Sequence, residues 1–246
     1  MANCLSLLQT LARHGLCAAG FILVSAAPLK AQSLPPSGAK TAIPATSDRL
    51  DPVARIDMQG ESASEAVIAV AGWIMRTNQQ NGNPFIIADK LNGHLFAFLE
   101  NGTLLAKSRA LYGAARSDAM TQEQADKTLA ELAAGDMITP AGIFPAHGYV
   151  SPTYGASIRF AEYANSNLLI HRAPAEWRRK NLQAAVNGKV HVTFGCINVL
   201  PEFMDKVLLP VFNGASTIFI LPELAPVRQF FAIDDTRDEA LKMARK

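Results

Sequence analysis

The N-terminal part of this chain lacks acidic residues, since none precedes Asp48. It carries Arg13 and His14, then the apolar run 15–27, then small residues around Ala31. That order is typical of a secretory signal peptide with cleavage near Ala31. The sequence also lacks a longer apolar run, and a membrane-spanning helix needs about 20 such residues. We therefore expect an exported protein with no membrane span after signal removal; a retained membrane anchor is the alternative.

Cysteine is scarce as well, with only Cys4, Cys17 and Cys196 in 246 residues. Removal of the signal peptide leaves Cys196 alone, so the exported chain cannot form an internal disulfide. A lone thiol is either a small buried hydrophobe or a reactive group. The lack of a second cysteine and of two histidines at helical spacing argues against a metal site. Glycine-rich phosphate loops are absent too, so we expect no cofactor.

The chain also lacks a concentrated basic face. Loss of Arg13 and Lys30 with the signal peptide brings the 23 basic residues level with the 21 acidic ones. The only compact basic run is Arg178-Arg179-Lys180. Nucleic-acid binding needs a larger basic patch, and we expect no nucleic-acid partner.

Composition and periodicity divide the chain into five parts. Residues 1–31 are the expected signal peptide, and 32–60, rich in Pro, Ser and Ala, predict a flexible linker. Residues 61–83 contain an N-terminal helix, 84–223 form one domain, and the charged segment 224–246 is a C-terminal tail.

The sequence predicts helices over residues 64–77, 121–134 and 201–212. The first two begin with the spacing of a capping box, at 62–65 and at 121–124. The third has proline in its first turn. Residues 175–185 also suit a helix.

Short strands dominate the rest. Runs 84–89, 94–100 and 103–112, separated by Asn92-Gly93 and Asn101-Gly102, predict a β-meander. Strands joined by such tight turns pair antiparallel. We therefore expect a mainly β (α+β) fold with helices at its edges. Further strands are expected over 157–160, 167–171, 189–194 and 216–221, and one after the turn residues 139–144.

Cys196 follows a β-branched strand and Gly195. A turn of this kind exposes a nucleophile, because glycine lets substrate approach the backbone and amide N–H groups near Cys196 suit an oxyanion. A tight turn with a buried cysteine is the other interpretation.

A cysteine nucleophile needs a base, and histidine suits that task. His171 ends an apolar strand that would hold it rigidly, and His191 lies closer to Cys196 in sequence. His94 and His147 are expected at the surface.

These residues resemble the L,D-transpeptidase catalytic domain family of the YkuD type, over about 84–223. The family has a histidine upstream of Ser/Thr-x-Gly-Cys-hydrophobic-Asn/Arg, an anchoring Thr-Pro-x-Gly-x-Phe and, in a proteobacterial branch, His-Arg and paired arginines. The matching residues here are His171-Arg172, Arg178-Arg179, Thr139 to Phe144 and Thr193-Phe194-Gly195-Cys196-Ile197-Asn198.

The resemblance implies an L,D-transpeptidase-type β-sandwich with peripheral helices and a periplasmic location. It implies that Cys196 is the nucleophile and His171 the base, that the Arg172 carbonyl orients the imidazole, and that the Gly195 and Cys196 amides bind the oxyanion. The implied substrate-binding residues are Thr193, Phe194, Asn198, Arg178 and Arg179. Phe194 replaces a histidine of many members and cannot form the hydrogen bonds of that histidine.

The implied partners are peptidoglycan stem peptides, and a periplasmic acceptor protein is a further candidate. Acyl transfer through a cysteine thioester would form cross-links, and carbapenems would acylate Cys196. Two alternatives remain: a hydrolase or amidase with the same fold, and an inactive muropeptide-binding module.

Overall fold

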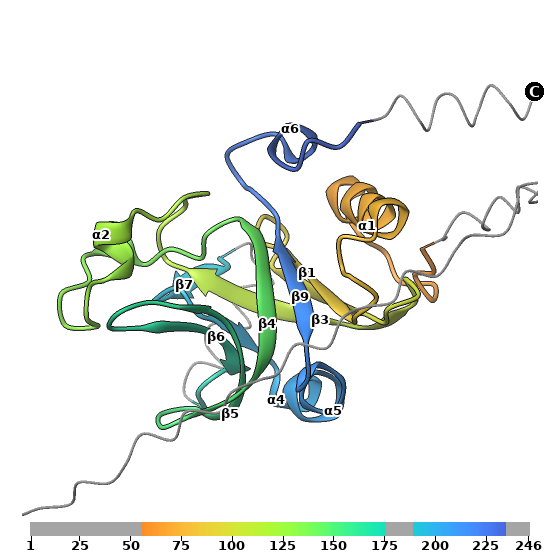
Figure 1. Ribbon diagram of the computed structural model, residues 1–246. Helices are drawn as coiled ribbons and strands as arrows, with labels where there is room; N and C mark the ends of the chain where they lie inside the picture. Colours follow the sequence, from red (N-terminus) through yellow and green to blue (C-terminus); the bar gives the residue numbers. More distant parts are fainter. Residues whose placement is uncertain (1–55, 176–188, 235–246) are drawn as a thin grey trace, which may run out of the picture. The chain divides into compact units, whose positions relative to one another are not determined.

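The computed structural model describes residues 56–175 and 189–234 (Figure 1). The expected signal peptide, most of the linker, nearly all of the helix predicted over 175–185 and the end of the C-terminal tail lie outside these residues. The described part is mainly β, as predicted. Its elements are α1 (Glu65–Thr77), β1 (Phe85–Asp89), β2 (His94–Phe98), β3 (Leu104–Gly113), α2 (Gln122–Ala125), the 3-10 turn η1 (Ala134–Asp136), β4 (Gly142–Ser151), β5 (Gly155–Glu162), β6 (Asn167–Arg172), β7 (His191–Thr193), β8 (Ile197–Val199), α4 (Pro201–Phe203), the π-helical turn η2 (Met204–Leu208), α5 (Leu209–Phe212), β9 (Ser216–Ile220) and α6 (Val227–Phe230).

The described strands form one closed sheet in the order β2-β1-β9-β4-β5-β6-β8-β3-β7, because β3 also pairs with β2. The predicted meander is confirmed: β1 pairs antiparallel with β2, and β2 pairs antiparallel with β3. Parallel pairs join strands that are distant in sequence: β1 with β9, β6 with β8, and β3 with β7. These pairings were not predicted, since no local turn signal specifies them.

Two apolar clusters pack against the sheet. Alternate residues of β1 belong to different clusters: Ile86 and Ala88 to the first, and Phe85 and Ile87 to the second. The first cluster also contains the segment α4-η2-α5, and the second contains the buried face of α1 (Figure 1). Side chains of a strand alternate between the faces of a sheet, so both faces of β1 are buried.

Helix α1 begins one residue after its cap, Ser64, whose hydroxyl accepts a hydrogen bond from the Val67 amide at 3.3 Å. The capping box expected over 62–65 is therefore wrong by two positions. Ser64 also donates to Asp89 at the end of β1, at 2.7 Å. This tertiary contact fixes the start of the helix at Ser64.

The helix predicted over 121–134 is much shorter than expected. Its capping box is present at Thr121, but α2 ends at Ala125. The next helical turn would use the carbonyls of Ala125 and Asp126, and these accept instead from Ser166, at 3.3 Å, and Asn165, at 2.7 Å. Hydrogen bonds from the segment before β6 thus end the helix.

The helical segment predicted over 201–212 is present, but it contains a π-helical turn. The Leu209 amide donates to the Met204 carbonyl, five residues back. Pro210 follows and has no amide hydrogen, so α-helical pairing is interrupted there.

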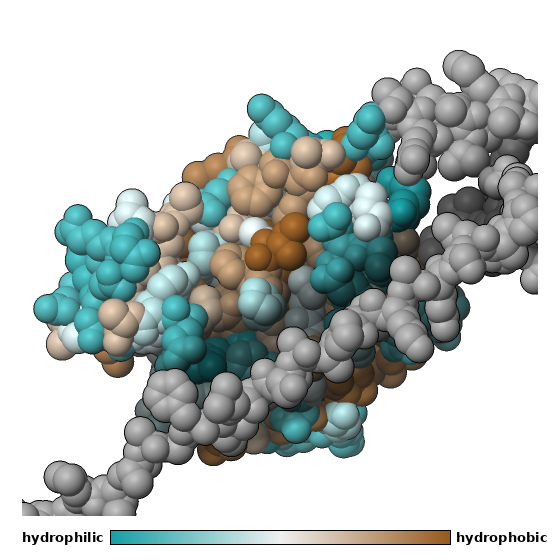
Figure 2. Space-filling view, viewed as in Figure 1, coloured by the Kyte–Doolittle hydropathy of each residue, from teal (hydrophilic) through white to brown (hydrophobic). Residues whose placement is uncertain are grey.

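The packed region continues past Glu223, where the sequence suggested a tail. Helix α6 contacts α1, and Phe231 and Ile233 belong to the second apolar cluster. Figure 2 shows apolar residues at the centre of the face in view, over β4 and β9, and hydrophilic residues over the short helix α2.

Candidate active site

Cys196 lies in the loop between β7 and β8. The preceding position, 195, accommodates only glycine. Gly195 has φ +123°, in the region that side chains disfavour, and a Cβ there would lie 2.8 Å from the Ile138 carbonyl oxygen. The Thr139 hydroxyl donates to the Gly195 carbonyl at 2.7 Å, and the Thr193 hydroxyl donates to the Cys196 carbonyl at 2.6 Å. Two threonines therefore fix the backbone on both sides of the thiol.

Gly195 and Thr193 are hydrogen-bonded to each other within the loop. The Gly195 amide, expected to bind an oxyanion, donates to the Thr193 hydroxyl at 3.2 Å. Thr193 is buried, and its hydroxyl is engaged on both sides. Its hydroxyl therefore holds the backbone of the loop at Gly195 and Cys196.

His171 lies beside this loop because β6 and β8 run parallel, with His171 opposite Asn198. His171 and Asn198 thus share one face of the sheet, and Ile170 and Ile197 share the other, inside the first apolar cluster. The His171 Nδ1 atom lies 2.9 Å from the Arg172 carbonyl oxygen. Since a carbonyl only accepts, Nδ1 carries the proton and Nε2 is the basic nitrogen of the neutral ring.

The ring of Tyr154 covers the imidazole of His171. The two rings stack with centroids 3.8 Å apart and planes 14° apart, and His171 is 3% exposed. Burial lowers the pKa of His171, partly offset by the hydrogen bond to Arg172. Burial raises the pKa of Tyr154, and the charge of Cys196 in its thiolate form raises it further.

Cys196 is half-buried at the cavity, and its thiol is uncharged at neutral pH. Burial raises its pKa to about 11, against a smaller lowering from a hydrogen bond with the Leu169 backbone. Its Sγ donates to the Asn167 carbonyl at 3.8 Å. These directions favour a neutral thiol at Cys196 and a neutral imidazole at His171 in the resting protein.

A cavity of about 410 Å³ opens beside Cys196. Its walls come from the insert between β3 and β4, the turn between β4 and β5, the start of β6, and Phe194. Phe194, which stands in the place of the family's histidine, is 46% exposed. Lys127 and Asp136 line the cavity but pair with each other at 3.0 Å. The rest of the lining is mainly apolar and aromatic, with some neutral polar residues.

The remaining predicted residues have varied positions. Asn198 is buried, with its Oδ1 atom lacking a hydrogen-bond partner, and it does not line the cavity. The Arg172 side chain pairs with Asp205 and donates to the Ala156 carbonyl, so only its backbone serves His171. Arg178 and Arg179 lie outside the described residues.

The structure separates the histidines that the sequence left as candidates. His191 directs Nδ1 at the Gly113 carbonyl, 3.0 Å away, and Nε2 at Glu223, 3.1 Å away. His147 lies against Arg159. His171 alone of these has its ring beside residues of the Cys196 cavity, through its stack on Tyr154.

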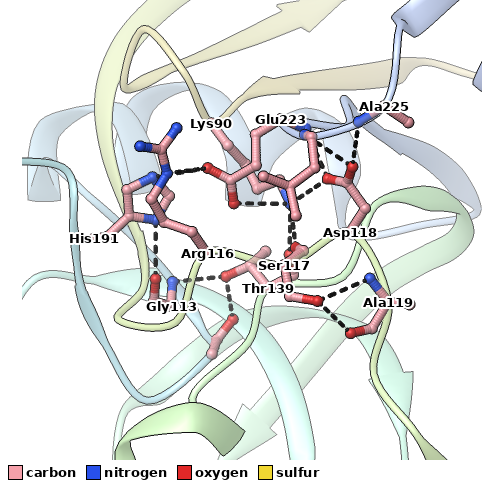
Figure 3. A network of polar contacts seen from close by, with 12 residues as sticks. Lys90, Gly113, Arg116, Ser117, Asp118, Ala119, Thr139, His191, Glu223 and Ala225 are labelled. Atoms are coloured by element: carbon pink, nitrogen blue, oxygen red, sulfur yellow. Dashed lines mark hydrogen bonds and ion pairs between the residues drawn. The ribbon is translucent and has the colours of Figure 1, made fainter.

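His191 belongs to a polar cluster that the sequence did not reveal, which we call the support cluster: Lys90, Arg116, Asp118, His191 and Glu223 (Figure 3). Its members are spread over 134 positions of sequence from Lys90 to Glu223, and no local pattern connects them. Within residues 56–175 and 189–234 no group of three or more metal-ligating side chains occurs. No helix in these ranges is long and apolar enough to span a membrane.

Neither protein-family models nor curated protein sequences match this chain. Among solved structures it is similar to the helical cell shape determining protein Pgp2 from Campylobacter jejuni, with 13% identity and a TM-score of 0.40, over 64% of this chain and 58% of that one. It is also similar to the L,D-transpeptidase (Yku) from Stackebrandtia nassauensis, with 14% identity and a TM-score of 0.34, over 65% and 68%. The catalytic domain of the E. faecium L,D-transpeptidase matches with 16% identity and a TM-score of 0.31, over 57% and 98%. The chain spans about three fifths of the length of Pgp2.

Proposed function

We propose that this protein is a periplasmic L,D-transpeptidase that cross-links peptidoglycan stem peptides through a thioester on Cys196. One observation carries the proposal: the His171 ring is held by the Arg172 carbonyl in the tautomer that leaves Nε2 basic, on the strand next to the Cys196 loop. The signature residues 193–198 and the anchoring residues 139–144 support it.

The resting thiol must lose its proton during attack, because its pKa is about 11. His171 accepts that proton as Sγ bonds to the carbonyl carbon on the L-to-D side of a stem peptide. His171 then returns a proton to the leaving nitrogen, the C–N bond breaks, and the terminal D-amino acid departs. An acceptor amine next attacks the thioester, loses a proton to His171, and Cys196 leaves as a thiol.

The oxyanion of each tetrahedral intermediate needs hydrogen-bond donors near the carbonyl. We assign this role to the Cys196 amide, since the Gly195 amide donates to Thr193. Phe194 supplies an apolar contact at the cavity in place of the family's histidine. Arg178 and Arg179 would bind stem carboxylates through their guanidinium groups.

Intact-mass analysis after incubation with a carbapenem tests the nucleophile, with a Cys196→Ala control. We expect one adduct per chain in the wild-type protein and none in the control. A folded wild-type protein that forms no adduct would overturn the assignment of Cys196.

Product analysis with muropeptides then separates the reaction classes. A transpeptidase forms cross-linked dimers from stems with a diamino acid at the third position. Cleaved stems without dimers would indicate a hydrolase or amidase instead. A binding module would yield no product.

A further inference from the structure

The support cluster lies outside the cavity, and none of its five residues lines it. Lys90 is 1% exposed, and its Nζ atom donates to the carbonyls of Ser117 and Thr139 at 2.9 and 3.0 Å. It also faces Asp118 and Glu223 at 3.5 and 3.4 Å. These contacts occupy the ammonium group fully, so Lys90 is a fixed cation rather than a nucleophile.

Glu223 joins three other side chains of the cluster. Its carboxylate lies 3.4 Å from Lys90, 3.2 Å from Arg116 and 3.1 Å from His191, and its side chain is 1% exposed. Asp118 accepts from the amides of Glu223, Leu224 and Ala225, at 2.6 to 2.9 Å, and so fixes the backbone at Glu223. Figure 3 shows these side chains converging from several segments of the chain.

Two connections lead from the cluster to the backbone at Cys196. The Lys90 ammonium group donates to the carbonyl of Thr139. The Thr139 hydroxyl in turn accepts from the Gly113 amide at 2.8 Å and donates to the Gly195 carbonyl. His191 begins β7, which ends at Thr193, and Thr193 donates to the Cys196 carbonyl. Both carbonyls that flank the thiol are therefore held by threonines next to the cluster.

Placing such a cluster in the interior is costly, because charges lose hydration there. Apolar residues of similar size often stabilise a fold equally well or better than a buried ion pair. Burial lowers the pKa of Lys90, and Glu223 and Asp118 oppose that lowering. Charged groups instead fix geometry, since each of their hydrogen bonds sets the position of its partner.

We propose that Thr139, Lys90, His191 and Glu223 are positioning residues for the reaction at Cys196: they set the backbone of the Gly195-Cys196 loop from outside the cavity. This inference rests on the proposed function of Cys196. None of these residues touches substrate. Their effect is to hold the thiol and its amide in the geometry that attack requires, and small displacements of reacting groups slow reactions strongly.

Thr139 offers a matched pair of variants. Thr139→Val keeps the shape and removes the hydroxyl, whereas Thr139→Ser keeps the hydroxyl and removes a methyl group. The measurement is carbapenem acylation of the purified protein, separated into the rate at saturation and the half-saturating concentration. We expect Thr139→Val to lower the saturating rate about tenfold with half-saturation changed less than about twofold, and Thr139→Ser to remain near wild type.

A second variant guards against loss of folding. His191 keeps part of its surface exposed, so His191→Ala is expected to fold and to lower the same rate to a smaller extent. Melting temperatures are measured for all variants. Wild-type rates in folded Thr139→Val and His191→Ala would overturn the proposal, as would equal losses in Thr139→Ser and Thr139→Val.

Failure of the proposed function is recognised separately. If the wild-type protein forms no carbapenem adduct, alkylation of Cys196 by iodoacetamide replaces it, followed across pH on the peptide that contains Cys196. A positioning role then predicts that the midpoint of the alkylation profile moves in Thr139→Val and stays in Thr139→Ser. Identical profiles in both variants and the wild type would refute it.

Discussion

The proposed site at Cys196 and His171 and the support cluster differ in the partners of their buried ionisable groups. Among the residues that the structure describes, no charged side chain pairs with Cys196 or His171, so burial raises the pKa of the thiol and lowers that of the imidazole. Lys90 and Glu223 are buried at least as deeply, but they lie 3.4 Å apart. Desolvation without a partner favours neutral groups that can exchange a proton, whereas pairing favours fixed charges.

Asp118 shows how the second site keeps its charge. Burial raises the pKa of this carboxyl, but the amides of Glu223, Ala225 and Leu224 and the charge of Lys90 together lower it below its ordinary value. The difference between the two sites is therefore one of partners and not of depth. The first arrangement suits the proposed proton transfer at Cys196, and the second suits the proposed positioning of the loop around it.

Removing the base should affect the first site most strongly. His171→Gln is expected to slow carbapenem acylation at pH 7 by on the order of 10²–10⁴-fold, because no group then accepts the thiol proton. The rate should partly recover as the pH approaches about 11, where the thiol ionises by itself. His147→Gln, altering a histidine beside Arg159, is the control. Acylation of His171→Gln at the wild-type rate would mean that another group activates Cys196.

Removing the buried cation of the support cluster should lower the free energy of unfolding. Lys90→Met removes one buried partner and leaves the carboxylates of Asp118 and Glu223 without it, so we expect a loss of about 3–5 kcal/mol in the free energy of unfolding. Urea denaturation measures it. Lys107→Met is the matched control, because Lys107 pairs with the more exposed Glu61 and should cost less than about 1 kcal/mol. Equal losses in the two variants would show that burial of the ion pair is unimportant.

Exposing the His171 ring to solvent should bring its pKa back towards the ordinary value. Activity requires neutral His171, and its pKa lies below the ordinary 6.5, so the rate should persist as the pH falls past that value. Tyr154→Ala exposes the ring and reduces its desolvation. The acidic limb of the acylation rate should then move to higher pH, towards 6.5. Tyr154→Phe, which keeps the stack, should leave the limb in place; a shift in both variants would assign the effect to the hydroxyl.

Local sequence signals predicted much of this fold because local physics decides it. The Asn-Gly turns, the antiparallel pairing of β1 to β3 and the apolar face of α1 are confirmed where the chain needs no distant partner. The candidates Cys196 and His171 were identified from the lone thiol, the apolar strand and the family motif. Predictions went wrong where distant residues compete for backbone groups, as in the early end of α2 and the cap of α1.

The sequence by itself determined which strands and turns form and which residue types are available for chemistry, because neighbouring residues set hydrophobic periodicity and turn conformation. Only the tertiary structure decided the parallel pairing that brings His171 opposite Asn198, the tautomer of its ring and the engagement of the Gly195 amide. It also assembled Lys90, Asp118, His191 and Glu223 into one cluster. Such contacts depend on the closure of the sheet, which joins segments that no short-range pattern connects.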